Sequence, residues 1–331
     1  MGYRRWVSGI IKTVALLLVF LAVFSLKYGY LDTVSAPFIA NRDDATGNES
    51  GTPPATSEKP TGTPAKTPPS QAAPITDDYI TIRPDASEIA RGSLLLVNQD
   101  HRYEITGEDG FIQISDEKTQ SYRIPDEGIL LDTLVIDSLN EMMDAFYYET
   151  GRDNIAIVSG FRDYDRQQEI LDDYIKLTGP VEALKWAAPP GYSEHHTGLA
   201  IDLGIFSSGT FRTFTGIGIN AWFKENCHRF GFVLRFTKEK TGVTGTVEEP
   251  WHFRYTGNPH AHFIHQNGWC LEEYIEFIRG YSFNEPYTGL YNEDTYEIYY
   301  TSGEELRIPF DCDFDYSGDN IDGFIVTIKY Q

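Results

Sequence analysis

The sequence predicts a chain of mixed helices and short strands, in which an ordered body follows an apolar N-terminal segment and a proline-rich stretch. Hydrophobic residues make up 41% and aromatic residues 14% of the 331 residues, which is enough for a substantial core. From Tyr79 onward, short apolar runs typical of strands are interleaved with longer runs of helical period.

Residues 1–30 are expected to form a cytoplasmic tip and a transmembrane anchor. Gly9–Leu26 is an apolar run at the short end of what a membrane span needs. Arg4 and Arg5 precede it, which predicts a cytoplasmic N-terminus. A cleaved signal peptide is the alternative, although Pro37 directly follows the small residues of its cleavage site. The favoured interpretation is a single-pass protein of the cell membrane, with the rest of the chain on the extracytoplasmic side.

Residues 31–77 are expected to form a disordered stalk. Prolines recur from residue 53 to residue 74, mixed with Thr, Ser, Gly and Ala. Such a segment buries too little apolar surface to offset the entropy lost on ordering. An extended stalk of this kind holds the following domain away from the bilayer.

The ordered part divides into residues 78–280, where a catalytic domain is expected, and residues 281–331, where a small β extension is expected. In the first part the patterns predict strands at 79–82, 93–98, 155–158 and 199–203, and helices at 131–148, 164–177, 181–187, 221–230 and 271–278. In the second part, 296–300 and 323–329 read as strands.

Charge and cysteine content argue against a nucleic-acid partner and against a zinc site made of thiolates. The formal net charge of −22 argues against a nucleic-acid partner, because phosphate binding needs basic surfaces. The three cysteines, Cys227, Cys270 and Cys312, include no C-x-x-C pair, which argues against a thiolate zinc site. They allow one disulfide at most, and the sequence leaves its pairing open.

The segment from Ser193 to Leu203 carries the densest set of chemically useful side chains. In a strand over its last five residues, the period of two places Asp202 and Ala200 on the face opposite Leu199, Ile201 and Leu203. His195 lies just upstream, and Gly198 permits a sharp turn between them. The side chains of His195 and Asp202 are therefore expected to converge.

A second segment supplies the remaining parts of a candidate metal site. His252 with His195 and Asp202 would give the two imidazoles and one carboxylate that suit a catalytic Zn²⁺ with an open fourth position. Glu249, three residues earlier, is the candidate general base, provided that Pro250 bends the strand. Taken singly, each of these residues is more often a satisfied polar group, and His196 is expected to be structural.

Three motifs in this order resemble the VanY-type D-alanyl-D-alanine carboxypeptidases, a zinc peptidase group shared with the VanX dipeptidases and the Hedgehog domain. The first is S-G-[FY]-R-x-x-x-x-Q, which begins at Ser159. The second is S-x-H-x-x-G-x-A-x-D, from Ser193 to Asp202, and the third is E-P-W-H, from Glu249 to His252. The resemblance covers roughly residues 93–278. It implies an α+β fold with a small antiparallel sheet flanked by helices.

The resemblance also implies a role for each site residue. His195, Asp202 and His252 would bind Zn²⁺, and Glu249 would move the proton of the attacking water to the leaving amine. Arg162 would stabilise the oxyanion. The substrate-binding residues would be Gln167 and Ser193.

The function implied is zinc-dependent removal of the terminal D-alanine from peptidoglycan stem peptides. An L,D-carboxypeptidase or a peptidoglycan endopeptidase of the same group is one alternative, and a non-catalytic module that binds cell-wall peptide is another. One departure from the family pattern is Asp163, which stands where many relatives carry Ser and could pair with Arg162.

Overall fold

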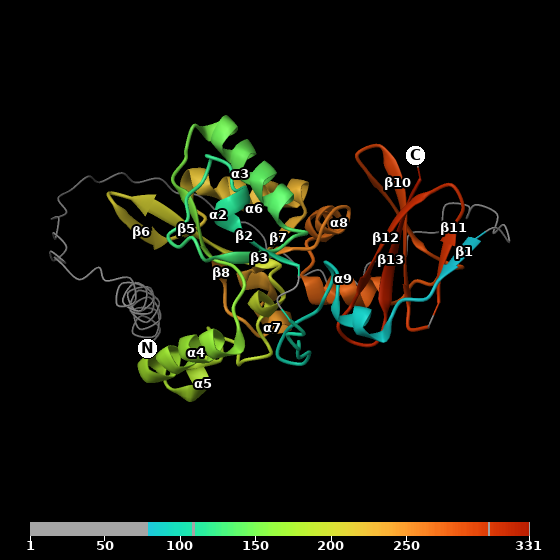
Figure 1. Cartoon of the computed structure of the whole chain (residues 1–331), viewed down its shortest axis with the longest axis horizontal. Helices are drawn as coiled ribbons and strands as arrows, with labels where there is room; N and C mark the ends of the chain where they lie inside the picture. Colours follow the sequence, from blue (N-terminus) through green and yellow to red (C-terminus); the bar gives the residue numbers. More distant parts are fainter. Residues whose placement is uncertain (1–78, 108–109, 304, 331) are drawn as a thin grey trace, which may run out of the picture.

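The computed structural model describes residues 79–107, 110–303 and 305–330 (Figure 1). The expected anchor and stalk lie outside these ranges. Within the described residues, no helix is both long enough and apolar enough to cross a membrane.

A five-stranded antiparallel sheet occupies the middle part of the chain. Its strand order is β4–β5–β8–β7, and β6 pairs with the outer half of β5. The strands are β4 (Ile155–Ser159), β5 (Ala200–Ser207), β6 (Thr210–Thr213), β7 (Phe232–Phe236) and β8 (Glu249–Tyr255). A separate pair of short strands is formed by β2 (Phe111–Gln113) and β3 (Leu130–Asp132). The small antiparallel sheet expected from the sequence is confirmed.

One face of the five-stranded sheet is covered by apolar side chains of helix α3 (Ile136–Thr150), which ends at Gly151 with φ 69°. Leu139 and Phe146 of this helix are fully buried with Ile201 and Phe253 of the sheet in one core. Because strand side chains alternate, the polar partners of these apolar residues lie on the opposite face. The sheet therefore has a sealed apolar side and a polar side.

The remaining helices surround this body and lead into the C-terminal part. They are α2 (Ile114–Glu117), α4 (Tyr164–Thr178), α5 (Pro180–Ala183), α6 (Ala221–Asn226), α7 (Thr241–Thr244), α8 (His260–Asn267) and α9 (Leu271–Ile278). The α4–α5 hairpin has its own small core around Leu171 and Tyr174 and lies apart from α3 (Figure 1).

The C-terminal part is a four-stranded antiparallel sheet in the order β12–β13–β10–β9. Its strands are β9 (Tyr287–Tyr291), β10 (Asp294–Thr301), β12 (Asp313–Gly318) and β13 (Phe324–Tyr330). Leu271 and Ile275 of α9 pack against Ile298 and Ile325 of this sheet. Beside it, β1 (Tyr79–Ile82) pairs with β11 (Leu306–Pro309), so the first described strand joins a strand near the end of the chain.

The strand expected at 93–98 is wrong. Leu94 and Leu96 are buried, but no neighbouring strand pairs with this segment. Its backbone is satisfied in other ways: the amide of Leu94 donates to Ser317 Oγ, and the carbonyl of Leu95 accepts from Arg254. An apolar run indicates burial of a segment but does not identify its hydrogen-bond partners, which here are side chains and the backbone carbonyl of Asp319.

Three expected helices differ in their bounds. The helix expected from 131 begins at Ile136, because residues 130–132 form β3 instead. The helix expected over 181–187 is shorter and ends at Ala183. The helix expected over 221–230 changes at Cys227 into a 3₁₀ turn that ends at Gly231.

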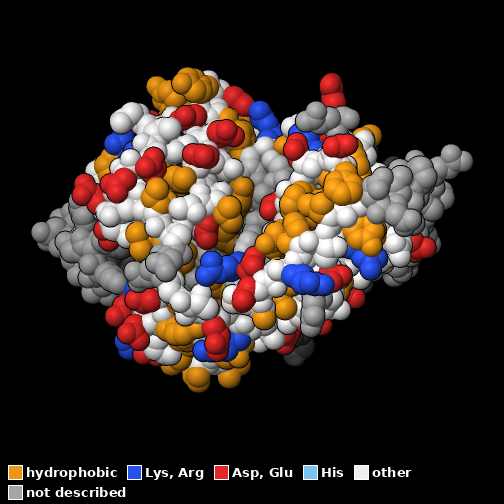
Figure 2. All heavy atoms as spheres, turned by 45° about the vertical axis from the view of Figure 1, so that its right-hand side comes forward, with side chains coloured by type: hydrophobic (Ala, Val, Ile, Leu, Met, Phe, Trp, Pro, Cys, Tyr) orange, Lys and Arg blue, Asp and Glu red, His pale blue; other side chains and the backbone are white. Residues whose placement is uncertain are grey.

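Acidic side chains are spread over the surface shown in Figure 2, and the cysteines carry free thiols. On that face the acidic side chains lie among smaller groups of basic side chains. All three cysteines are free, and burial raises the pKa of Cys227 to about 12, which makes that thiol unreactive.

His260 at the start of α8 links the two parts of the chain. Its ring nitrogens are 2.6 Å from the hydroxyl of Tyr274 and 3.1 Å from that of Thr327, on α9 and β13. Burial lowers the pKa of His260 to about 3. An unfolded histidine, with a pKa of about 6.5, takes up a proton at mildly acidic pH while the folded one stays neutral. Stability is therefore expected to fall as the pH drops from about 6.5 toward 3.

The variant His260→Gln should lose less stability on acidification than the wild type does. At pH 5 the buried neutral ring costs the wild type on the order of 2 kcal/mol relative to neutral pH. Urea unfolding of both proteins at pH 7 and pH 5 measures this difference. Equal losses in the two proteins would show that His260 does not carry the effect.

Candidate metal centre

Two of the predicted ligands face each other across neighbouring strands. In the antiparallel pairing of β5 with β8, Asp202 lies directly opposite His252. Both project from the polar face of the sheet, since Ile201 and Phe253 occupy the apolar face. Side chains of directly opposed residues on one face are close enough to interact. The strand register thus brings together residues that are 50 positions apart.

The third predicted ligand, His195, comes from a 3₁₀ turn formed by Glu194–Thr197, just before β5. Ser193 caps this turn, because its hydroxyl accepts from the amide of His195 at 3.4 Å. Gly198 ends the turn with φ 70°. A Cβ at that position would lie 2.6 Å from the ring of Phe111, so only glycine fits both the conformation and the space.

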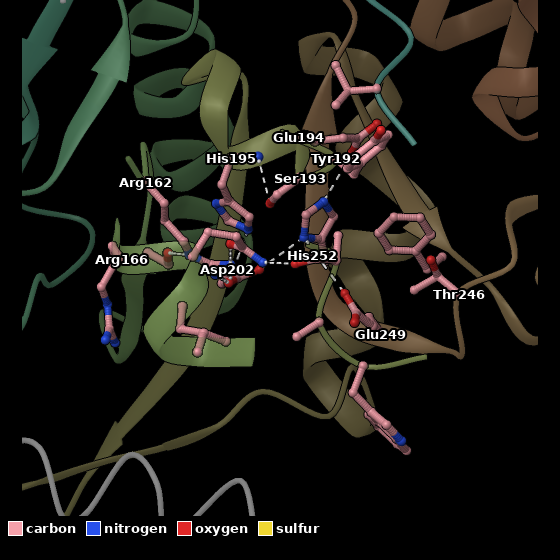
Figure 3. Close-up of a pocket in the computed structure, with 18 of the residues that line it drawn as sticks. Arg162, Arg166, Tyr192, Ser193, Glu194, His195, Asp202, Thr246, Glu249 and His252 are labelled. Carbon is pink, nitrogen blue, oxygen red and sulfur yellow. Dashed lines mark hydrogen bonds and ion pairs between the residues drawn. The ribbon is translucent and has the colours of Figure 1, made fainter. Parts of the chain in front are cut away.

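The three side chains point toward one another at the floor of a cavity (Figure 3). One ligand atom from each of His195, Asp202 and His252 lies within 4.8 Å of the others, and all three residues are buried. The Asp202 carboxylate is 3.3 Å from His195 Nε2 and 3.1 Å from His252 Nδ1. The expected convergence of His195 and Asp202 is confirmed, and His252 joins them.

The donor set fits a zinc ion. His195 Nδ1 is 2.7 Å from the carbonyl oxygen of Gly160, so that nitrogen carries the ring proton and Nε2 is left with its lone pair. That Nε2 atom is buried and has no hydrogen-bond partner. A buried imidazole nitrogen without a partner is costly unless a cation binds it. Two imidazoles and a carboxylate are the ligands that catalytic zinc sites use.

The electrostatics favour a neutral His195 and an ionised Asp202. Burial, followed by the nearby Arg162 guanidinium, lowers the pKa of His195 to about 4. Burial alone would raise the pKa of Asp202, but contacts with its neighbours, among them the Arg162 guanidinium, hold it well below its usual range. His195 and Asp202 are thus in the protonation states that bind a metal ion. Burial alone would lower the pKa of His252, but Asp202 and Glu194 raise it to about 9, so His252 must release a proton when a metal ion binds.

Glu249, the candidate base, lies beside the cluster. Its carboxylate is 3.8 Å from His252 Nδ1 although the two residues are three positions apart on β8. The pairing of β7 with β8 shifts register between Leu234 and Phe236, opposite this stretch, which brings both side chains to one side. Burial raises the pKa of Glu249 to about 8, as is typical of a carboxyl group that exchanges protons near neutral pH.

Arg162 projects into the same cavity from the loop after β4. Its guanidinium donates to Ser159 Oγ at 2.9 Å, to the amide oxygen of Gln167 at 3.3 Å, and to the carboxylate of Asp202. The amide nitrogen of Gln167 donates to the carbonyl of Ala188 at 2.7 Å. Both ends of the Gln167 side chain are therefore engaged with the protein, and Gln167 lines the cavity while holding Arg162.

Two neighbours of these residues have structural tasks. His196 accepts from the amide of Gly191 at 2.9 Å, and its other nitrogen is 2.6 Å from the carbonyl of Arg162, as expected for a structural histidine. Asp163 caps helix α4, because its carboxylate accepts from the amide of Arg166 at 2.7 Å. The expected possibility that Asp163 pairs with Arg162 is not realised.

No pattern in the sequence identified Glu194, whose carboxylate lies 3.2 Å from His252 Nε2. Burial would raise the pKa of Glu194, but Arg235 and Arg254 lower it far below the usual range and keep the group ionised. The signal in the sequence was weak, since a glutamate in a polar stretch is usually exposed. Much of the cavity wall was equally not predictable from the sequence; it includes Ile170, Tyr174, Trp186, Phe236 and Thr246.

The cavity itself measures about 630 Å³ and is wide enough for a peptide end. The candidate base, the three candidate ligands and Arg162 all line it. A metal ion held by the three ligands would share this cavity with the carboxyl group of Glu249 and the guanidinium of Arg162. Such a combination suits hydrolysis of an amide bond.

Comparisons with known proteins agree with this chemistry. The family model VanY, described as D-alanyl-D-alanine carboxypeptidase, matches residues 128–258. A D-alanyl-D-alanine carboxypeptidase of Enterococcus faecium is 31% identical over 248 residues, which are 73% of this chain and 76% of the relative. Another, from Enterococcus faecalis, is 41% identical over 131 residues, 36% of this chain and 46% of the relative.

One solved structure is similar over nearly its whole length. It is the vancomycin resistance D,D-dipeptidase VanXYg in complex with a D-Ala-D-Ala phosphinate analog. It shares 33% sequence identity, has a TM-score of 0.68, and covers 76% of this chain and 99% of its own.

Replacing Asp163 tests whether its task is to cap the helix. Asp163→Ala should lower the free energy of unfolding by about 1 kcal/mol, because the amide of Arg166 loses its acceptor at the N-terminus of α4. Asp163→Ser should retain most of the stability, since serine is an equally good capping residue. Chemical denaturation of the three proteins checks this. A serine variant as unstable as the alanine variant would contradict the capping role.

Proposed function

Because this chain belongs to the family of VanY D-alanyl-D-alanine carboxypeptidases, we propose that it removes the terminal D-alanine from peptidoglycan stem peptides. The observation that carries the proposal is the buried group His195, Asp202 and His252 on the floor of the cavity, with Glu249 at its edge. Zn²⁺ is the cofactor that fits these donors.

When bound, zinc would supply a Lewis acid that polarises the scissile carbonyl and lowers the pKa of a water molecule. His195, Asp202 and His252 would hold it. The chain's own residues carry the rest of the reaction.

Glu249 is the proposed general base. Its carboxylate takes a proton from the attacking water as the new C–O bond forms, and returns that proton to the leaving amine as the C–N bond breaks. Its place 3.8 Å from His252 Nδ1 puts it within reach of a water molecule at the metal site. A carboxyl group whose burial raises its pKa to about 8 can both accept and return a proton near neutral pH.

Arg162 is the proposed stabiliser of the oxyanion. Its guanidinium is held by Ser159 and Gln167 at the edge of the metal site, where negative charge develops on the substrate oxygen. In this proposal Gln167 and Ser193 support the substrate site through the residues they position. Gln167 fixes Arg162, and Ser193 caps the turn that presents His195.

For the whole chain we propose attachment to the cell membrane by residues 1–30, with residues 31–77 as a spacer. The apolar run and the basic residues before it support this proposal. It would place the catalytic part on the extracytoplasmic side, where peptidoglycan stem peptides are found.

Incubation of the zinc-loaded protein with a stem pentapeptide that ends in D-Ala-D-Ala should release D-alanine, as seen by mass analysis of the peptides. Glu249→Gln should reduce the rate by at least about 100-fold, because the proton acceptor is lost. The matched control is Glu248→Gln, which removes an exposed carboxylate next to it and should act like the wild type.

Full activity of Glu249→Gln would contradict the proposed base. Shortening of a tetrapeptide in place of the pentapeptide would identify an L,D-carboxypeptidase, and cleavage of cross-linked dimers an endopeptidase. Peptide binding without any product would favour the binding module.

A further inference from the structure

Glu194 occupies an unusual place for a carboxylate, since its side chain is only 2% exposed and it touches the proposed metal site from behind. It directly precedes His195 in the 3₁₀ turn, yet its carboxylate contacts the other histidine, His252. Glu194 therefore belongs to the turn that carries the proposed ligand His195 and also contacts the ring of a second proposed ligand, His252.

Each oxygen of Glu194 has its own partners. Oε1 accepts from Arg235 Nε at 2.8 Å and from Arg254 Nη1 at 3.0 Å, and both arginine side chains are fully buried. Oε2 lies 3.2 Å from His252 Nε2. Glu194 is ionised, so it can only accept hydrogen bonds, and His252 Nε2 must therefore carry a proton.

The two arginines hold Glu194 through further contacts. Arg235 donates two hydrogen bonds to the carboxylate of Glu272 on α9, at 2.8 and 2.7 Å. Arg254 donates to the carbonyl oxygens of Ser93 and Leu95 at 3.0 and 2.9 Å. With its partners fixed in this way, the Glu194 carboxylate cannot turn away from His252.

We propose that Glu194 is a positioning residue for the metal site, because it holds a proton of His252 on Nε2 and so makes Nδ1, the nitrogen that faces Asp202 and His195, the one that gives up its proton to bind a metal ion. This inference rests on the proposed zinc site. A neutral imidazole has one protonated nitrogen, and the partner of that nitrogen decides which atom is free to bind a metal. Nδ1 is the atom on the side of the other ligands, 3.1 Å from the Asp202 carboxylate.

Arg235 and Arg254 also determine how the amide of a glutamine at position 194 would be oriented. In Glu194→Gln, the amide oxygen should face Arg235 and Arg254, because both offer donors and need an acceptor. The amide N–H₂ then faces His252 Nε2 and donates to it. His252 would have to accept there and carry its proton on Nδ1, where the zinc ion should bind.

The test compares zinc affinity, measured by competition with a chelator, in the wild type, Glu194→Gln and Glu272→Gln. Loss of this type of partner typically weakens metal binding 10- to 100-fold, so a loss of about that size is expected for Glu194→Gln. Glu272→Gln is the matched control, because glutamine removes the negative charge without contact to His252, keeps an oxygen that can accept from Arg235, and leaves both arginine contacts of Glu194 in place. Its zinc affinity should change by less than about threefold, far below the loss at Glu194.

Ring ¹⁵N spectra give a second measurement, and its first part uses the wild type alone. In the zinc-loaded wild type, His252 should show a slowly exchanging proton on Nε2 and a metal-bound Nδ1. In metal-free Glu194→Gln, the proton should be on Nδ1.

Three results would overturn the proposal: equal zinc affinity in the wild type and Glu194→Gln, an equal loss in both variants, or, in the zinc-loaded wild type, a metal-bound Nε2 of His252 with the proton on Nδ1. Failure of the wild type to bind zinc at all would instead overturn the metal site itself.

Discussion

The pairing of β5 with β8 is the constraint on which the rest of the site depends. It sets Asp202 opposite His252 and, on the other face, buries Ile201 and Phe253 under α3. A shift of one residue in this register would move the ligands to the apolar face and expose the core residues to the cavity. The packing that stabilises the domain and the geometry of the site are thus fixed by the same hydrogen-bonded ladder.

The polar side of this sheet holds several buried charged side chains. Their burial is tolerated because they pair with one another. Arg235 and Arg254 are both fully buried, and Glu194 and Glu272 accept their hydrogen bonds. Removing one partner from such a group costs about 3–5 kcal/mol, because the remaining charge is buried without compensation. The same cluster connects the site to α9, whose apolar side packs on the C-terminal sheet, and to the backbone at Ser93 and Leu95. The C-terminal sheet therefore supports the region behind the metal site.

The sequence predicted the parts of the site that depend on local periodicity. The alternation from Leu199 to Leu203 placed Asp202 on the polar face, and Gly198 predicted the turn before it. The motifs identified Arg162, Glu249 and His252 together with the antiparallel sheet. Contacts between distant segments were not predictable in this way. In the sequence Glu194 resembles an exposed acid, since its arginine partners lie far along the chain on β7 and β8. Residues 93–98 resemble a strand, although their backbone bonds to side chains and to the carbonyl of Asp319.

Zinc is expected to bind between His195 Nε2, Asp202 and His252 Nδ1. Anomalous diffraction at the zinc absorption edge, from crystals of the zinc-loaded protein, locates the ion. We expect a single strong peak at distances of about 2.0–2.2 Å from those three side chains, with Nε2 of His252 turned toward Glu194. A peak on the Nε2 side of His252, or at cysteine or other histidine side chains with none at this group, would contradict it.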